Sequence, residues 1–565
     1  MNLDKDKAAI AARLRQAGAM LRFRGESLHR ARAYERGAET IEAFSGDLQR
    51  LVSEGRLTEL PGIGRSLAAT ITALIQEGQS ATLERISGDL PGPLAELINV
   101  RGFTPRRIQL LHDRLDVATV EDVRGALASG AAAQVKGIGP VVADKLLAAL
   151  DRSAGPRQTL LPEAARLAAR LLNHLRSQPS VVQSSVAGTV RRCVEVVGEL
   201  NLVAASAGPE EVVASFLRHP AVAAVVQRNA ADCTVRLRQG LSATLTVAAP
   251  ATFGAALLCA TGATAHVDQL AQRARALGLA LDQIPGATEW DVYRALGLCL
   301  IPPELREGRG ELAAAAAGDT FADLVTDEDV RGAVHCHSVH SDGNATIAEM
   351  AAGAARLGLS YLTVTDHSPA AAYAGGLSAE ALRQQGREID QLQEQVPLLL
   401  LRGAECDILA DGSLDYGEDV RDELDVVIAS IHERHKMDAA AMTTRLARAL
   451  GHRRFKIWGH PLGRLLLRRP PVACDFEAIL DVLAGSPSAI EVNGSPYRLD
   501  LPAELIPAAR RRGIKFVISA DAHSVAEFGN LRSGVAVARR GGLRRGDVLN
   551  TLPAEEFARV TRSHG

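Results

Sequence analysis

The pattern of hydrophobic and polar positions changes character twice along the chain. Through residues 1–155, apolar residues recur three and four positions apart in segments such as 8–25, 27–44 and 66–78, with glycines between them. This spacing is typical of short amphipathic helices that pack against each other. We therefore expect two all-helical domains, at residues 1–85 and 86–155.

The next segment, residues 156–282, combines two patterns. A helical period at 162–177 is accompanied by β-rich runs such as 194–203 and 241–249. The mixture predicts an α+β domain. An alanine-rich stretch at 308–322 is typical of a helix that fades into a linker.

Beyond residue 330, apolar β-runs alternate with helical stretches. This alternation is the pattern of parallel strands joined by crossover helices, and it predicts an α/β barrel at residues 331–565. The runs lie at 332–337, 361–366, 398–406, 425–432, 455–460, 488–493 and 515–520.

Composition narrows the class of protein. At 565 residues and 47% hydrophobic content, the chain is long enough for three to five domains of about 100–200 residues, each with its own core. The 64 basic and 66 acidic residues leave a net charge of -2, which disfavours disorder and a uniformly basic nucleic-acid coat. Any polyanionic partner must therefore be bound locally.

Cysteine usage and hydropathy indicate the compartment. The seven cysteines form no CxxC pair and are odd in number, which favours reduced thiols in a cytosolic protein. The N-terminus lacks the hydrophobic region of a signal peptide, and no apolar run approaches about 18–20 residues. We expect a cytoplasmic protein with no membrane-spanning segment.

Histidines gather in the C-terminal region. Ten of the 15 lie beyond residue 330, and most of the predicted strands there end in a residue type that binds metal ions. Side chains at the carboxyl ends of barrel strands converge, so these residues point to one site. The candidate metal ligands are His335, His337, Asp342, His367, Glu405, His432, His460, Asp521 and His523.

Nine ligand-type residues exceed the needs of a single ion. They predict a centre of two or three metal ions, with a carboxylate such as Glu405 as a bridge. Nitrogen and oxygen donors without thiolate favour Mn²⁺, Fe²⁺ or Zn²⁺ over Ca²⁺ or a structural zinc site. Adjacent divalent ions suit hydrolysis of phosphate esters, because they activate water near neutral pH and neutralise the entering and leaving oxygens. An ordinary core or surface side chain is the alternative for any single histidine, and the repeated placement at strand ends argues against it.

The C-terminal motifs carry a resemblance. HCHSVHSDG, TDHS, GAECDIL, ASIH, WGHPLGRLL, EVNGSPYRLDL and SADAHS resemble, in order, the motifs of the polymerase-and-histidinol-phosphatase (PHP) superfamily, in the form found at the C-terminus of bacterial family X DNA polymerases. The resemblance covers almost all of 331–565. It implies that the nine residues bind three divalent ions, typically Mn²⁺, in a phosphoesterase site with 3'-5' exonuclease activity; Zn²⁺ and Fe²⁺ are the alternatives. Ser338 and Ala520 depart from the family's usual threonines, but neither is a ligand.

Two arginines follow directly after motif strands. Arg464 lies in HPLGR and Arg498 in PYRLD. The candidate catalytic residues are these two arginines and Glu405. The arginines are included because a guanidinium group binds phosphate oxygens in a forked geometry. A surface salt bridge is the alternative for both arginines.

Gly-hydrophobic-Gly turns separate helical segments of the N-terminal region, in LPGIGRSLAATI (60–71) and VKGIGPVVADKLL (135–147). Such a turn exposes backbone N–H groups at a helix start, where a DNA phosphate binds without net positive charge. A glycine helix cap is the alternative for either copy. In a third segment, RGFTPRRIQLL, Thr104 replaces the second glycine, which indicates a degenerate copy. The candidate DNA contacts are Gly62, Gly64, Arg65, Gly137 and Gly139.

These turns resemble the helix-hairpin-helix elements of the family X lyase and fingers domains. The family's lyase nucleophile is a lysine in the helix after the first hairpin; residues 65–71 contain none, so lyase activity is not expected. By the same resemblance, residues 156–282 are the polymerase palm and 283–318 the thumb, followed by a linker at 319–330.

The palm positions that bind metal in the family differ in this chain. The family holds two Mg²⁺ ions with three aspartates, and the corresponding residues here are Glu199, Asn201 and Thr244. One carboxylate in place of three predicts a palm that is retained in structure but weak or inactive in nucleotidyl transfer. The alternative is that Glu195 or Asp232 substitutes as a ligand and supports residual Mn²⁺-dependent synthesis.

The sequence thus predicts a DNA-repair exonuclease built on a family X polymerase. By this interpretation it is a monomer in the bacterial cytoplasm, associated with the nucleoid, and it acts on gapped, nicked or 3'-ended DNA. The alternatives are an active gap-filling polymerase with an accessory nuclease, a phosphatase of small phosphate monoesters, and a DNA-repair scaffold without catalysis.

Overall fold

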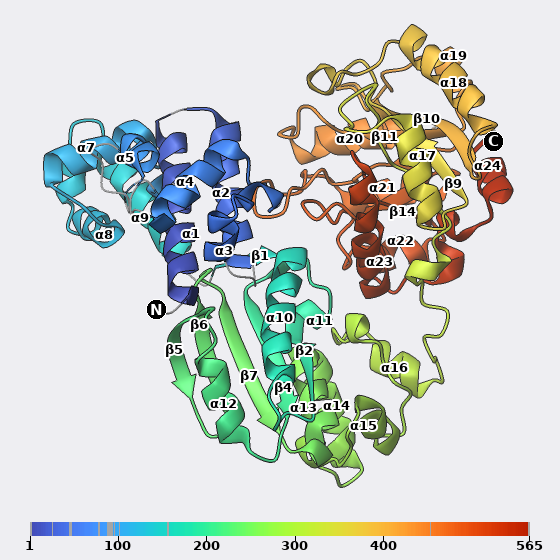
Figure 1. Ribbon diagram of the computed structural model, residues 1–565. Coiled ribbons are helices and arrows are strands. Elements are labelled where there is room, and N and C mark those ends of the chain that lie inside the picture. The colour runs from blue at the N-terminus through green and yellow to red at the C-terminus, as the bar shows by residue number, and fades with distance from the viewer. Residues whose placement is uncertain are drawn as a thin grey trace. The chain divides into compact units, whose positions relative to one another are not determined.

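The computed structural model describes residues 3–24, 26–43, 48–60, 62–76, 80–87, 94, 96–100, 102–154, 157–451 and 454–562. The chain forms two compact units, Met1–Arg157 and Gln158–Gly565 (Figure 1), and each is described by itself. All seven cysteines lie among the described residues and are free thiols. No helix in this part of the chain combines the length and the apolar character that a membrane span requires.

The N-terminal unit is all-helical, as expected. Its buried apolar residues form one cluster that extends from Ile10 to Leu150, and α1 (Leu3–Phe23) packs along α2 (Leu28–Ala43). The other helices are α3 (Leu48–Ser53), α4 (Arg65–Gln76), α5 (Ala81–Ser87), α7 (Pro105–Leu115), α8 (Val120–Ala128) and α9 (Pro140–Ala154), with short 3-10 helices η1 (Leu57–Glu59), η2 (Glu96–Asn99) and η3 (Ala131–Gln134).

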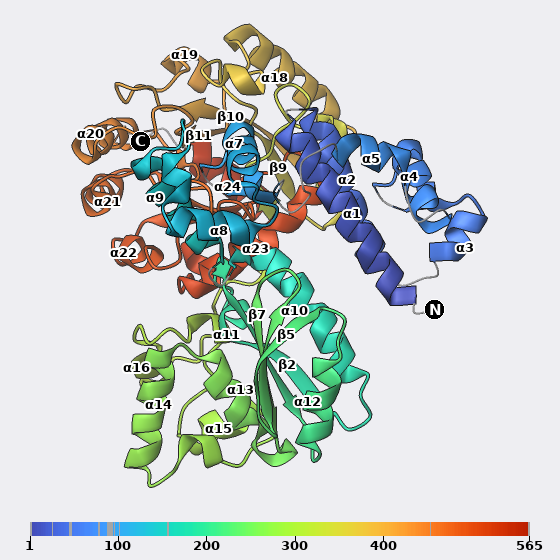
Figure 2. The same cartoon turned by 90° about the vertical axis from the view of Figure 1, so that its left-hand side faces the viewer.

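The second unit begins with a five-stranded sheet in the order β2-β4-β7-β6-β5. Strands β4 and β7 are parallel, and the other neighbours are antiparallel. Helices α10 and α12 cover one face through residues such as Leu200, while α13 covers the other through Val203 (Figure 2). The elements are α10 (Leu161–Arg176), β2 (Gln183–Ala187), β4 (Glu199–Ala205), α12 (Pro209–Leu217), β5 (Val222–Arg228), β6 (Asp232–Leu237), β7 (Ser242–Ala248) and α13 (Phe253–Thr261).

A small helical core follows the sheet. It contains α14 (Thr264–Ala276), α15 (Glu289–Ala295) and α16 (Glu311–Ala316). It packs against α13 through Leu258. An ionic link adds to this contact, because the buried carboxylate of Glu289 accepts hydrogen bonds from Arg191 at 2.6 and 2.7 Å and also pairs with the buried Arg306.

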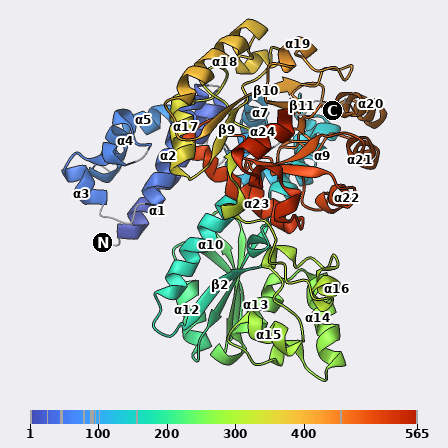
Figure 3. The same ribbon diagram turned by 90° about the vertical axis from the view of Figure 1, so that its right-hand side faces the viewer.

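The remaining chain forms the predicted parallel barrel. Its seven strands run in the order β14-β13-β12-β11-β10-β9-β8, all neighbours parallel, and a bridge between Cys336 and Ala522 nearly closes the ring. Helices surround the strands (Figure 3), which explains why the strand sequences are apolar on both faces. The strands are β8 (Gly332–Ala333), β9 (Tyr361–Val364), β10 (Leu399–Asp407), β11 (Val426–Ser430), β12 (Ile457–Trp458), β13 (Ala489–Asn493) and β14 (Lys515–Ser519).

The helices between and after these strands supply the outer layer of the barrel core. They are α17 (Ile347–Arg356), α18 (Ala379–Gln393), α19 (Glu418–Arg421), α20 (Ala439–Leu450), α21 (Phe476–Ala484), α22 (Ile506–Arg511), α23 (Leu531–Arg540) and α24 (Ala554–Arg562). Each predicted β-run therefore contains one strand, and the carboxyl end of each strand carries the residues considered next.

Candidate metal centre

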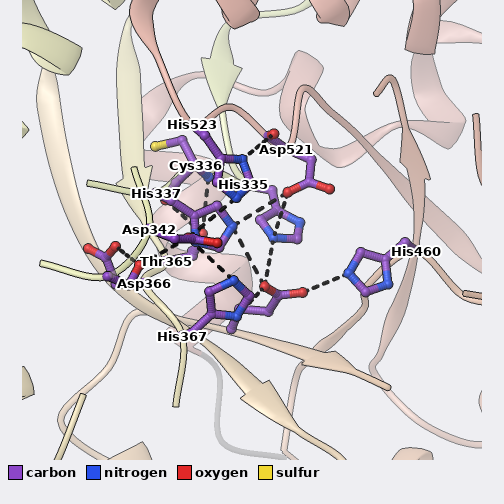
Figure 4. Close-up of polar contacts among 12 residues, drawn as sticks. His335, Cys336, His337, Asp342, Thr365, Asp366, His367, His460, Asp521 and His523 are labelled. Atoms are coloured by element: carbon purple, nitrogen blue, oxygen red, sulfur yellow. Dashed lines mark hydrogen bonds and ion pairs between the residues drawn. The ribbon is translucent and has the colours of Figure 1, made fainter. Parts of the chain in front are cut away.

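Side chains from the carboxyl ends of the barrel strands converge on one site (Figure 4), and all nine candidate ligands lie there. Eight of them form three overlapping groups, within each of which the ligand atoms are within 4.8 Å of one another. The ninth, His460, has its Nε2 atom 2.8 Å from Oε1 of Glu405. The groups are His337, Asp342, His367 and His523; His335, His337 and Asp521; and His367, Glu405 and His432.

Glu405, on β10, lies among several of these imidazoles. Its Oε1 atom is 3.2 Å from Nε2 of His432 and 2.8 Å from Nε2 of His460. Its Oε2 atom is 3.0 Å from Nδ1 of His367 and 3.5 Å from Nε2 of His335. Because the two oxygens face different imidazoles, this carboxylate belongs to more than one of the ligand groups and would hold cations together with them.

Several buried polar atoms of the centre have no hydrogen-bond partner among the described residues. Burying such atoms without a partner is unfavourable, and converging lone pairs are what a cation satisfies. The donors are nitrogen and oxygen, and the nearby thiol of Cys336 instead donates to the carbonyl of Thr363 at 3.1 Å. The residues therefore fit a group of divalent cations such as Mn²⁺, Fe²⁺ or Zn²⁺. The unpartnered atoms are His335 Nε2, both ring nitrogens of His337, His367 Nδ1, His460 Nδ1 and Glu405 Oε1.

The charges of the centre oppose the cost of burial. Burial favours a higher pKa for Glu405, but His432, His335 and His367 outweigh it and hold that pKa well below its usual range. Burial lowers the pKa of His432, but Glu405 and Asp407 outweigh it and raise the pKa to about 10. A cation that binds must displace imidazolium protons, so metal binding should strengthen as the pH rises.

A carboxylate without a predicted role orients His335. Glu491, on β13, accepts hydrogen bonds from Nδ1 of His335 and from Oγ of Ser519, both at 2.6 Å, and from the backbone N–H of His460. The proton on Nδ1 leaves the lone pair of Nε2 directed at the centre, as in many carboxylate–histidine–metal arrangements. The sequence signal for such a role is a buried carboxylate within a strand of the barrel, two residues before the strand ends at Asn493.

Two further carboxylates support the ligands. Asp407 lies 3.2 Å from Nδ1 of His432, and its spacing of two from Glu405 puts both on one side of β10, a signal present in the sequence. Asp366 accepts hydrogen bonds from the backbone N–H and the hydroxyl of Ser338, at 2.8 and 2.6 Å. These contacts join the segment that follows β8 to the segment that follows β9, and both segments carry candidate ligands.

The two candidate clamp arginines have different surroundings. Nε of Arg498 is 3.3 Å from Asp521, and its Nη1 atom is buried without a hydrogen-bond partner among the described residues. Arg464 donates to the backbone carbonyls of Arg498, at 2.9 Å, and of Leu499, and it pairs with Glu195 at 3.3 Å. Arg498 therefore adjoins the metal centre, whereas the Arg464 guanidinium is occupied by the loop behind it.

In the N-terminal unit, both Gly-Ile-Gly turns have the same conformation. Gly62 and Gly137 have φ of 78° and 104°, a left-handed region that favours glycine. The buried Ile63 and Ile138 follow, and the N–H of each donates to the carbonyl three residues earlier. Helices α4 and α9 begin directly after the turns, and Arg65, the first residue of α4, is exposed.

The second glycines leave the backbone open to a ligand. A Cβ atom added at Gly64 or Gly139 would meet nothing within 4 Å. The third turn keeps the conformation despite its different sequence: Gly102 has φ of 95°, Phe103 is buried, and the Thr104 hydroxyl accepts a backbone N–H at 3.3 Å at the start of α7. The first glycine and the buried apolar residue therefore suffice to form the turn.

Comparisons with known proteins agree with this geometry. The helix-hairpin-helix domain matches residues 5–80, the DNA polymerase beta thumb 256–307, and the PHP domain 333–458. DNA polymerase/3'-5' exonuclease PolX of Bacillus subtilis (strain 168) is 31% identical over 562 residues, which cover 96% of this chain and 97% of that protein. The chain belongs to the family X DNA polymerases with a PHP domain. The resemblance in the motifs is confirmed, as are the helix-hairpin-helix, thumb and barrel folds.

The barrel of this family X chain also has relatives without the polymerase domains. Probable phosphatases of Thermoanaerobacter sp. (strain X514) and Shewanella sp. (strain MR-4) are 28% and 26% identical over 235 and 230 residues. The matches cover 38% and 39% of this chain but 89% and 86% of the phosphatases. The PHP barrel is thus similar to nearly the whole of each phosphatase.

The predicted metal positions of the family X palm lie side by side. Asn201 on β4 is in register with Thr244 on β7. The Thr244 hydroxyl donates to Oε1 of Glu199 at 2.6 Å and contacts the hydroxyl of Thr234 at 2.9 Å. Of the three positions, one carries a carboxylate, and a neutral hydroxyl hydrogen bonds to it.

The two carboxylates considered as substitutes have partners of their own. Glu195 is buried, and its oxygens pair with Arg464 at 3.3 Å and with Arg540 at 2.8 Å, both from the barrel. Asp232 accepts a hydrogen bond from Asn229 at 2.8 Å. The Glu195 carboxylate therefore joins the sheet domain to the barrel.

Proposed function

We propose that this family X chain is a metal-dependent 3'-5' exonuclease that hydrolyses DNA in its PHP barrel. The observation that carries the proposal is the convergence of nine ligand-type side chains, several with buried atoms that lack a partner among the described residues. The activity in the name of the Bacillus subtilis relative supports the same substrate and direction. We infer three Mn²⁺ ions from the resemblance to the PHP motifs; Zn²⁺ and Fe²⁺ are the alternatives, because nitrogen and oxygen donors suit all three metals.

The side chains have distinct proposed roles. Divalent cations, when bound, supply Lewis acidity for attack on the phosphodiester. Glu405 holds imidazoles on both of its oxygens and so keeps the ligand groups together. Arg498 offers an unpartnered Nη1 atom beside Asp521 and would bind a phosphate oxygen as negative charge builds up on it. Nε of Arg464 donates to the backbone carbonyl of Arg498 and so positions that residue. Of the two arginines, Arg498 is therefore the proposed phosphate clamp.

The N-terminal turns are the proposed grip on DNA. Gly62, Gly64 and Gly137, Gly139 present backbone N–H groups at helix starts, and the open space over Gly64 and Gly139 admits a phosphate. Arg65 adds a positive charge. We propose that a monomer holds gapped, nicked or 3'-ended DNA in this way.

Substitution of ligands tests the nuclease. His337→Ala and Glu405→Ala should abolish Mn²⁺-dependent shortening of 5'-labelled DNA, while DNA binding persists. His340→Ala is the matched control, because this histidine lies in the same motif but pairs with Glu388 at 2.8 Å. Undiminished cleavage by both ligand variants would refute the assignment.

We also propose that the palm site is weak or inactive. With Glu199 as the single carboxylate of the three positions, the charge that would neutralise two divalent ions is reduced. Primer extension with Mg²⁺ and with Mn²⁺ tests this: robust extension that Glu199→Ala abolishes would contradict the proposal. An Asn201→Asp/Thr244→Asp variant, which restores three carboxylates, should extend primers better than the wild type.

A phosphatase of small monoesters is the second candidate function, favoured by the similarity of the barrel to probable phosphatases. Cleavage of p-nitrophenyl phosphate and of labelled DNA, compared at equal enzyme concentration, separates the two. Preference for the monoester would favour the phosphatase. Absence of metal-dependent cleavage of both substrates would favour a scaffold without catalysis.

A further inference from the structure

Two tyrosines of the barrel are exposed: Tyr373 lies beside two of the candidate ligands, and Tyr497 directly precedes Arg498, which contacts Asp521. Tyr373 is 70% exposed and Tyr497 is 52% exposed. The chain has six tyrosines, and the other four are buried. Burial of a large aromatic ring is favourable, so rings that remain in water around a site indicate a ligand with apolar faces.

Tyr373 adjoins two of the candidate ligands. It lies in the 3-10 helix η8 (Ala372–Ala374), and its ring centre is 6.3 Å from the ring centres of both His367 and His432. An exposed aromatic ring beside the centre is suited to stacking.

Tyr497 directly precedes Arg498, whose Nε atom is 3.3 Å from Asp521 and whose Nη1 atom is buried without a hydrogen-bond partner among the described residues. The Arg468 guanidinium is 5.4 Å from the centre of the Tyr497 ring. The backbone carbonyl of Tyr497 accepts the N–H of Leu466 at 2.8 Å, which fixes the loop. A cationic group thus lies over this ring.

We propose that Tyr373 and Tyr497 stack on unpaired nucleobases at the 3' end of a DNA strand whose terminal phosphodiester enters the metal centre. This inference rests on the proposed exonuclease function. A single strand alternates base and phosphate, and the site offers aromatic rings together with Arg468 and Arg498. Stacking on tyrosine is tolerant of sequence, because every base has a π-face.

The proposal predicts a substrate preference. A base that stacks on either tyrosine must leave its complementary strand, so single-stranded or frayed 3' ends should be degraded in preference to blunt duplex ends. The identity of the terminal base should matter little.

Steady-state kinetics of the full chain on a 5'-labelled single-stranded oligonucleotide test the stacking. Tyr373→Ala and Tyr497→Ala should each raise KM about tenfold, at the lower part of the range for one stacked base, with little change in kcat. Tyr373→Phe and Tyr497→Phe keep the rings and should behave as the wild type. Trp290→Ala is the matched control, because this ring is 52% exposed with Arg294 4.5 Å from its centre, but lies on α15.

A second substrate, without bases at its 3' end, tests how much the bases contribute to KM. On an oligonucleotide whose last two 3' nucleotides are abasic, the wild type should show the raised KM, and the tyrosine-to-alanine variants should lose nothing further. An unchanged KM of both alanine variants on intact DNA, or an equal loss on the abasic DNA, would overturn the stacking while leaving the exonuclease intact.

A binding measurement separates the two proposals. Fluorescence of 2-aminopurine at the 3' end should be quenched on binding to the wild type and to the phenylalanine variants, and less quenched with the alanine variants. If the wild type cleaves no DNA with any divalent metal, the exonuclease function fails; the quenching still decides whether the rings stack on bases.

Discussion

Replacement of Glu491 by glutamine tests the idea that a buried carboxylate tunes the metal centre. Glu491 accepts a hydrogen bond from Nδ1 of His335 at 2.6 Å and one from Ser519 at the same distance, and it is fully buried. Glutamine keeps the size of the side chain but removes its charge. The charge-assisted bond that holds His335 with Nε2 towards the centre is thereby weakened.

The expected magnitude follows from this contact. Loss of a carboxylate that orients a metal-binding histidine reduces metal affinity by about 10- to 100-fold, which is about 1.4–2.8 kcal/mol. The pKa of His335 also changes. Burial lowers it, but Glu491, Glu405 and Asp521 outweigh burial and raise it well above its usual value. Without the Glu491 charge the proton leaves more easily, so the loss of affinity should be larger at pH 8 than at pH 6.

The assay is a titration of chelator-treated protein with Mn²⁺, followed by the electron paramagnetic resonance signal of the free ion. Glu388→Gln is the control, because Glu388 contacts His340 at 2.8 Å, also through a carboxylate and an imidazole, but on the partly exposed surface. It should bind Mn²⁺ as the wild type does. A Glu491→Gln protein with wild-type affinity and stoichiometry at pH 8 would show that His335 needs no carboxylate to orient it.

Three further predictions concern stability and DNA binding. Glu195→Ala removes a buried carboxylate that Arg464 and Arg540 share. Because Arg540 keeps Glu307 and Arg464 keeps two backbone carbonyls, the free energy of unfolding should fall by about 3 kcal/mol, the low end for a broken buried pair, in urea denaturation followed by circular dichroism, against little change for the exposed Glu394→Ala. Burial, with His174 and Arg170, lowers the pKa of His219 to about 4, so the unfolded chain binds a proton that the folded chain does not. Stability should therefore fall as the pH drops from about 6.5 to about 4, and a stability–pH profile as steep for His219→Asn as for the wild type would contradict this. Gly139→Ala should fold normally, because nothing lies within 4 Å of the added Cβ, but the methyl group should weaken DNA binding in fluorescence anisotropy; unchanged affinity would exclude that turn as a phosphate site.

Local patterns in the sequence determined the architecture and the membership of the metal centre. Apolar runs of strand length, separated by helical periods, predict parallel strands, and in a parallel barrel the carboxyl ends of the strands meet at one edge. A ligand-type residue at each of those ends, such as His335 or Asp521, must then lie near the others. The seven strands and the convergence of the nine residues follow from this rule.

The first glycine and the apolar residue after it likewise determined the N-terminal turns. Gly102 and Phe103 form the third turn with Thr104 in place of the second glycine, so the sequence of that turn is altered but its conformation is not. The palm positions were proposed from the sequence as well. The parallel register of β4 and β7 places two of them, Asn201 and Thr244, side by side.

Only the tertiary structure decided which side chains meet across long separations. Glu491 pairs with His335 across 156 positions, and Arg464 reaches Glu195 across 269, where it joins two domains instead of facing the metal centre. Tyr373 is one more polar aromatic residue in the sequence, and the fold brings its exposed ring beside His367. Hydrophobic periodicity specifies which face of an element is buried. It carries no information about the partner of an individual charge or ring, because that depends on how the packed elements approach one another.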